Sequence, residues 1–176
     1  MLSNIAKQES NEAQELRGLF EHSLKELYWI ENVMMPMLGH SIIIACSKDL
    51  VALLERHRIL TITHVQRLEK VFDIIGLNPR EIRSDSLQCL IDEAENLEGQ
   101  TKHGVVRDAA LIAVLQKIKH HEIACYGTMR AFAIALREES AVTLLEQTLQ
   151  EEKDNDLALT YIAESHINIE AADKEI

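Results

Sequence analysis

The chain has few residues that interrupt helices, with only six glycines and two prolines among its 176 residues. Glycine and proline are the strongest helix breakers, so this composition is typical of a mostly helical protein. No apolar run approaches the roughly 18 residues that cross a bilayer, and we expect no membrane association. The first residues, MLSNIAKQESNEAQE, contain no apolar signal core, and we do not expect secretion.

Cysteine and positive charge are also scarce. Cys46, Cys89 and Cys125 are widely spaced and form no CxxC pair, which removes the commonest zinc and redox motifs. Unpaired cysteines without a signal peptide indicate a reducing compartment, so we expect a cytoplasmic protein. The net charge of −11 argues against nucleic acid as a partner, because little here would neutralise phosphates.

Apolar periodicity predicts one all-α domain over residues 1–176. The helices are expected at about 11–38, 48–75, 86–98, 105–137 and 140–167, followed by a frayed acidic tail at 168–176. Pro36 is expected to kink or end the first helix, with an irregular stretch from Ile42 to Cys46 after it. Two helical hairpins joined by one long crossover, which carries the short fifth helix, are the connectivity of a ferritin-like four-helix bundle.

Acidic residues interrupt the apolar seams of three of these helices. In the fourth predicted helix the seam is Leu111, Leu115, Ile118, Glu122, Cys125, Met129, Phe132 and Leu136. Glu31 interrupts the first helix in the same way, and Glu152 with Asp156 interrupts the last. A buried carboxylate must be paired, protonated or bound to a metal. The pattern therefore predicts a polar site inside the bundle.

The ferritin-like di-metal template takes a single Glu from each of two helices and a Glu-x-x-His pair from each of the others. Glu31 and Glu122 fit the single-Glu positions, and Glu151, Glu152 and Asp156 are the candidates on the last helix. Carboxylates with some imidazole suit iron or manganese.

The second predicted helix departs from this template. Its inward seam carries His57 and His64 but no acid, and the chain contains no Glu-x-x-His. Seven helical residues span about 10.5 Å, so the two histidines cannot share one ion; one would ligate and the other would support it. Alternatively, the acids pair with His57, His64, Arg67 or Lys119 in a metal-free network.

From about Leu16 to Asn168 the chain resembles the YciE/YciF bacterial stress proteins. The stretches that carry the resemblance are LFEHSLKELYWIE, HVQRLEKVF, VVRDAALIA, KIKHHEIACYGTM and TLQEEKDNDLALT. The resemblance implies four long helices and a short one, frequently a homodimer, with a di-iron or similar centre, and some members are described as ferroxidases. The family acids match Glu31, Glu122 and the cluster that contains Glu151, Glu152 and Asp156.

The family's second helix usually reads His-Leu-Glu-Glu-Thr, where this chain has His57-Arg58-Ile59-Leu60-Thr61. The centre is therefore expected to be partial, with one ion or none. One hypothesis is a metal-binding oxidoreductase that oxidises Fe(II) or reduces peroxide. The alternative is a non-catalytic dimeric stress protein with salt-bridged core acids, in which Ile59 and Leu60 pack in the core. Convergence of the Glu31, Glu122 and Glu152 carboxylates within about 6 Å would favour the first.

Overall fold

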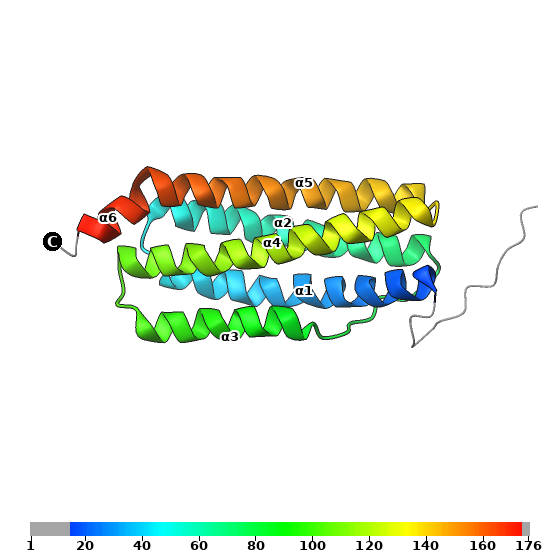
Figure 1. The fold of residues 1–176 in the computed structure, drawn as a ribbon, viewed down its shortest axis with the longest axis horizontal. Helices are drawn as coiled ribbons and strands as arrows, with labels where there is room; N and C mark the ends of the chain where they lie inside the picture. Colours follow the sequence, from blue (N-terminus) through cyan, green and yellow to red (C-terminus); the bar gives the residue numbers. More distant parts are fainter. Residues whose placement is uncertain (1–14, 174–176) are drawn as a thin grey trace, which may run out of the picture.

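The computed structural model describes residues 15–173, and these residues form an elongated bundle of helices (Figure 1). The helices are α1 (Leu16–Ile44), α2 (Lys48–Ile74), α3 (Asp85–Gln100), α4 (Val105–Ala135), α5 (Glu139–Ile162), the π-helical turn η1 (Ala163–Ile167) and α6 (Asn168–Asp173). Helices α1, α2, α4 and α5 run side by side, and α3 lies along the outside of the bundle. No helix in this part of the chain is both long and apolar enough to cross a membrane.

The connectivity is that of two antiparallel hairpins, α1–α2 and α4–α5. Helix α2 ends and α4 begins at opposite ends of the bundle, so the connection between them runs its full length and contains α3 (Figure 1). Helix α3 packs mainly against α4. The predicted ferritin-like, all-α fold is confirmed, and residues on four helices can meet in the middle of the bundle.

Local signals in the sequence fix the ends of α2. The Ser47 hydroxyl accepts a hydrogen bond from the Leu50 amide at 3.5 Å, as an N-cap does. Gly76 ends the helix with a φ of 75°, a left-handed conformation that glycine adopts without strain. The Asp108 carboxylate on α4 accepts the amides of Cys46 and Ser47 at 2.9 and 2.8 Å, which ties the α1–α2 turn to the other hairpin.

The bundle core consists of two apolar clusters with a polar layer between them. The first cluster includes Met34, Leu38, Leu50, Leu54, Leu115, Ile118 and Leu159. The second includes Phe20, Leu24, Leu68, Phe72, Met129 and Leu145. Along α2, α4 and α5 the residues of the two clusters are separated by polar residues, and on α1 Glu31 lies next to the boundary between the clusters. We define the polar layer as Glu31, His57, His64, Lys119, Glu122 and Glu152. All six side chains are buried.

The first helix differs from the prediction at its C-terminal end. Helix α1 continues through Pro36 to Ile44, so the expected irregular stretch from Ile42 to Cys46 is mostly helical. Leu38 and Ser41 are buried, and Ile44 packs against the first cluster. This packing maintains the helix beyond the hydrogen bond that proline removes. The predicted start near residue 11 lies outside the described residues.

The ends of the second hairpin also differ from the prediction. Helix α4 ends at Ala135 instead of 137, because Arg137 has a φ of 58° and cannot continue a right-handed helix. The predicted 140–167 helix becomes α-helical to Ile162 and then π-helical to Ile167. Residues 168–173 of the expected frayed tail form α6, anchored by the buried side chain of Ile167 just before it.

Candidate metal centre

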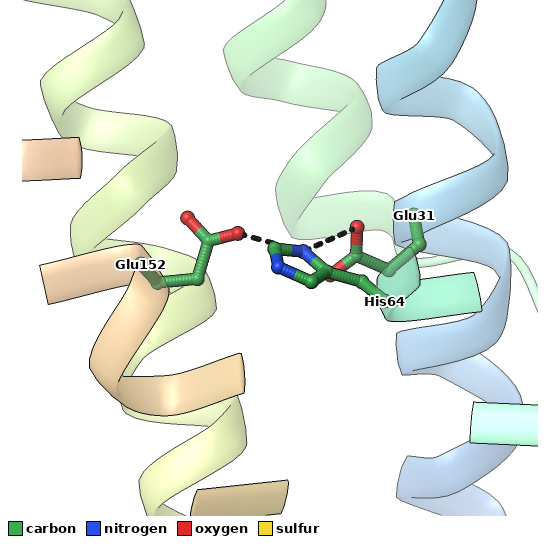
Figure 2. Close-up of side chains that lie close together, drawn as sticks. All are labelled: Glu31, His64 and Glu152. Atoms are coloured by element: carbon green, nitrogen blue, oxygen red, sulfur yellow. Dashed lines mark ion pairs between the residues drawn. The ribbon is translucent and has the colours of Figure 1, made fainter. Parts of the chain in front are cut away.

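Three buried side chains from three helices converge in the polar layer (Figure 2). Glu31 on α1, His64 on α2 and Glu152 on α5 each offer one ligand atom, and these atoms lie within 4.8 Å of one another. The His64 Nδ1 atom is 3.4 Å from Glu31 Oε2 and 3.1 Å from Glu152 Oε1. We call these three residues the donor site.

The other polar atom of each donor-site residue is held by a neighbour. The Tyr126 hydroxyl donates to Glu31 Oε1 at 2.6 Å, and the Lys119 ammonium donates to Glu152 Oε2 at 2.6 Å. The His64 Nε2 atom lies 2.9 Å from Glu151 Oε2.

The remaining atoms, Glu31 Oε2, Glu152 Oε1 and His64 Nδ1, are buried without a hydrogen-bond partner. Metal ligands are commonly oriented by outer contacts of this kind, with a histidine donating its second N–H to a carboxylate. The donor chemistry and the convergence of these three atoms therefore fit one divalent ion.

Arg67 and Glu151 close the donor site on its outer side. The Arg67 guanidinium donates to both Glu151 oxygens, at 2.6 and 2.7 Å, and to the Thr148 hydroxyl at 3.1 Å. This bidentate pair, with His64, lowers the pKa of the Glu151 carboxyl, so Glu151 stays charged. The side chains of Arg67 and Glu151 are 15% and 28% exposed, so the network meets solvent here.

The other half of the polar layer surrounds a lysine. The buried Lys119 ammonium on α4 contacts Glu122, Glu152 Oε2 at 2.6 Å and His57 Nε2 at 2.9 Å. Glu152 therefore faces both halves of the layer, with Oε1 toward His64 and Oε2 toward Lys119. Lys119 fills the space between these three acceptors.

Lys119 and its surroundings shift the pKa values of Glu122 and Glu152 in opposite directions. Burial opposes the charge of Lys119, but the carboxylates of Glu122, Glu152 and Glu31 outweigh it and raise the lysine pKa. Burial also raises the pKa of the Glu122 carboxyl, to about 8. Lys119 and the two histidines outweigh burial at Glu152 and hold its pKa well below the usual range. Glu122 therefore holds a proton more tightly than Glu152 does.

The two histidines of the layer differ in protonation. Burial and the charge of Lys119 lower the pKa of His57, so its neutral ring accepts from the lysine. Burial also acts to lower the pKa of His64, but the carboxylates of Glu31 and Glu152 raise it to about 10. A proton on His64 and a divalent ion at the donor site are therefore alternatives.

The sequence profile described as "Domain of unknown function (DUF892)" matches residues 15–172. The chain belongs to the DUF892 family. It is 32% identical to the protein YciF of Escherichia coli (strain K12) over 160 residues, which cover 90% of this chain and 96% of YciF. The resemblance to the YciE/YciF stress proteins is confirmed.

Solved structures share the fold of this DUF892 chain. The crystal structure of the E. coli stress protein YciF has a TM-score of 0.84 and 31% identity, covering 88% of this chain and 98% of that one. YcfI from Rhodopseudomonas palustris, for which a structural role has been suggested, has a TM-score of 0.83 and 32% identity, covering 86% and 96%. A protein from Xanthomonas campestris, at 16% identity and a TM-score of 0.73 over 92% and 100%, shows the fold alone.

Five of the predicted site residues meet through direct contacts in this DUF892 chain. Glu31, His64 and Glu152 form the donor site, Glu151 contacts it from the edge, and His57 Nε2 lies 3.6 Å from Glu152 Oε1. The Glu31 and Glu152 ligand atoms lie within 4.8 Å of one another, and Lys119 contacts both Glu122 and Glu152, so the acids lie close together with a lysine between two of them. The structure thus combines features of both sequence hypotheses.

Asp156, another predicted site residue, does not belong to the donor site. Asp156 is partly exposed and lies 3.5 Å from His120 Nε2 at the edge of the bundle. The buried seam of α5 passes from Glu152 to Asn155 and then Leu159, a step of three followed by four, which rotates Asp156 out of the core.

After Glu122 the buried face of α4 also contains residues other than those predicted. Tyr126 and Ala133 are buried, whereas Cys125 and Phe132 are only partly buried. Sequence reasoning therefore missed Tyr126 and did not place Lys119 among the site residues. A signal for both exists, since residues three before and four after Glu122 share its helix face.

The expectation that Ile59 packs in the core is wrong. Its side chain is 67% exposed on the outside of α2, and Leu60 is partly buried. The aliphatic residues at the family's acid positions therefore do not rebuild an apolar core in place of a metal ligand. The contribution of α2 to the polar layer comes from His57 and His64.

Proposed function

We propose that this member of the DUF892 stress-protein family binds one divalent metal ion, iron(II) or manganese(II), through Glu31, His64 and Glu152. The observation that carries the proposal is that each residue has one polar atom held by a neighbour and one buried atom, without a hydrogen-bond partner, that lies close to the other two. Two carboxylates with an imidazole suit iron and manganese. A bound ion would supply one-electron redox or Lewis-acid chemistry there.

The chain's own residues would position and charge-balance this ion. Tyr126 and Lys119 fix the rotamers of Glu31 and Glu152, and Glu151 fixes the tautomer of His64 that leaves Nδ1 free. Oxidation of Fe(II) or reduction of peroxide by two coupled ions, which the resemblance suggested, needs a second set of free ligands. Among the described residues only the donor site forms a converging set.

A metal-free structural role is the second candidate. The cations Lys119, Arg67 and protonated His64 balance the carboxylates of Glu31, Glu151 and Glu152, while Glu122 keeps its proton. A polar layer in which each charge has an opposite charge beside it supports a core that needs no ion. The structural role suggested for the related YcfI agrees with this candidate.

Metal content separates the two candidates. The protein is purified without chelator, reconstituted with Fe(II) or Mn(II) under anaerobic conditions, desalted and analysed by plasma mass spectrometry. We expect one ion per chain in the wild type and in the exposed control Glu55→Gln, and loss of stoichiometric binding in Glu31→Gln. If the wild type stays metal-free after reconstitution, the metal-binding proposal fails and the structural role remains.

The homodimer implied by the resemblance is part of this proposal. Leu157 and Tyr161, one turn apart on α5, are 69% and 72% exposed. Large apolar side chains exposed on one helix face support burial against a second copy. Light scattering should give twice the chain mass for the wild type. A monomeric mass would contradict the dimer without affecting the metal proposal.

A further inference from the structure

We infer that the Lys119 ammonium stands at the position of a second metal ion and restricts this chain to a single ion. The inference rests on the proposed function in one respect, because it takes the donor site as the place of the first ion. It concerns a different half of the polar layer and a residue that is not itself a metal ligand.

The acceptors around Lys119 repeat the chemistry of the donor site. Glu122 on α4, Glu152 on α5 and His57 on α2 supply two carboxylates and one imidazole from three helices. The donor site has the same composition, with Glu31, Glu152 and His64. The polar layer thus contains two sets of the same composition that share Glu152, and the second has an ammonium between its members.

Glu152 joins the two sets as a bridging carboxylate would join two ions. Its Oε1 atom faces His64 at 3.1 Å, and its Oε2 atom accepts from Lys119 at 2.6 Å. Two-metal sites hold their ions about 3.5–4 Å apart, a spacing that a carboxylate spans with one oxygen on each ion. Lys119 therefore occupies the partner position relative to the donor site.

The ammonium is suited to replace an ion at this position. It hydrogen-bonds to Glu152 Oε2 and His57 Nε2 and forms an ion pair with Glu122, so it contacts each of the three residues of the set. Its side chain is fully buried, which leaves the set closed to solvent. An ammonium cannot change oxidation state, so the layer keeps one redox-capable position, and the residue at 119 determines how many ions are bound.

The test is the Mn(II) stoichiometry of Lys119→Met, which removes the ammonium and keeps an unbranched chain of similar length. Lys117→Met is the matched control, because Lys117 lies on the same helix with its side chain half exposed. Wild type and control should bind one Mn(II), with the six-line spin-resonance spectrum of an isolated ion. Lys119→Met should bind two, with the six-line signal lost to spin coupling.

The outcomes separate this inference from the proposed function. If the wild type binds one ion and Lys119→Met also binds one, the role of Lys119 is overturned and the donor site stands. If the wild type binds none and Lys119→Met gains one or more, the wild-type metal site fails and the role of Lys119 stands. No binding by either protein overturns both.

Circular dichroism with and without Mn(II) checks that the variants fold. If Lys119→Met is unfolded without metal, Mn(II) should restore its helical spectrum, because the ion takes over the charge of the ammonium. Lys119→Gln, which retains a hydrogen-bond donor, should bind the same number of Mn(II) ions as Lys119→Met. Failure of both variants to fold in saturating Mn(II) would also overturn the inference, since an ion would then be unable to replace Lys119.

Discussion

The polar layer and the two apolar clusters beside it are equally buried, but they respond differently to the loss of one side chain. In the clusters a truncated residue leaves a cavity, and its neighbours lose only part of their contacts. In the polar layer each charge depends on a named partner, and removal of one leaves another charge buried without compensation. The stability of the layer should therefore depend on metal and pH, and that of the clusters should not.

Lys119→Met should have the largest effect on stability. In chelator at pH 7 we expect a loss of about 3–5 kcal/mol, because Glu152 keeps its charge while its lysine partner is removed. Urea unfolding measures the loss, and Mn(II) should reverse most of it. A change below about 1 kcal/mol would mean that the charges of the layer are not coupled in this way.

Leu115→Ala tests the apolar side of the comparison. Leu115 is fully buried in the first cluster, and its truncation should cost about 2–5 kcal/mol in urea unfolding. Unlike the loss in Lys119→Met, this loss should be the same with chelator and with Mn(II). If Mn(II) restores the stability of Leu115→Ala, the apolar clusters and the polar layer do not differ in their dependence on metal.

Glu151→Gln should weaken metal binding while leaving the donor site in place. Its carboxylate orients His64 and is itself held by Arg67, so we expect a 10–100-fold increase in the Mn(II) dissociation constant. Calorimetric titration measures this change. Glu146→Gln, on the same helix with a largely exposed side chain, is the control and should bind as the wild type does. Equal affinity in the two variants would remove Glu151 from the site.

The pH dependence of the metal-free protein should show the smallest effect. The folded-state pKa values of Glu122, about 8, and His64, about 10, are raised, so the folded state binds these protons more tightly than the unfolded one. Their stabilisation is complete below the unfolded values and is lost as pH rises through the folded ones. Each of the two groups contributes about 1 kcal/mol per pH unit between pH 7 and 8, so we expect a fall of about 2 kcal/mol per pH unit in total.

Thermal unfolding in chelator at several pH values measures this slope. Glu122→Gln removes one of the two titrating groups, so its slope should be smaller than that of the wild type in this interval. Leu115→Ala should keep the wild-type slope, since it changes no titrating group. A wild-type stability that rises from pH 7 to 8 would contradict the assigned protonation of Glu122 and His64.

The apolar clusters were largely predictable from the sequence, because helical periodicity is a local property. The same periodicity also predicted that Glu31, Glu122 and Glu152 are buried. It did not predict where a seam changes its step, and this change brings Asn155 and Tyr126 inward and turns Asp156 out. The step depends on how neighbouring helices pack, which a single helix does not encode.

The partner of each acid was harder to predict than its burial. Lys119 was one of several cations available to a metal-free network, and only the packing of α2, α4 and α5 brings it to Glu122, Glu152 and His57. Likewise, packing decides that α1 continues past Pro36, since the residues beyond it contribute to the core. The resemblance indicated the family and the positions of the acids, but it did not indicate the lysine that lies between Glu122 and Glu152.

The partly exposed pair of Arg67 and Glu151 has a kinetic consequence. It covers the donor site where the network meets solvent, so an ion can enter or leave when this bidentate contact opens. Ion pairs near solvent weaken as salt screens them. Exchange should therefore quicken with ionic strength, and the residence time of the ion would be set by the opening rate of the pair as well as by the affinity of the ligands.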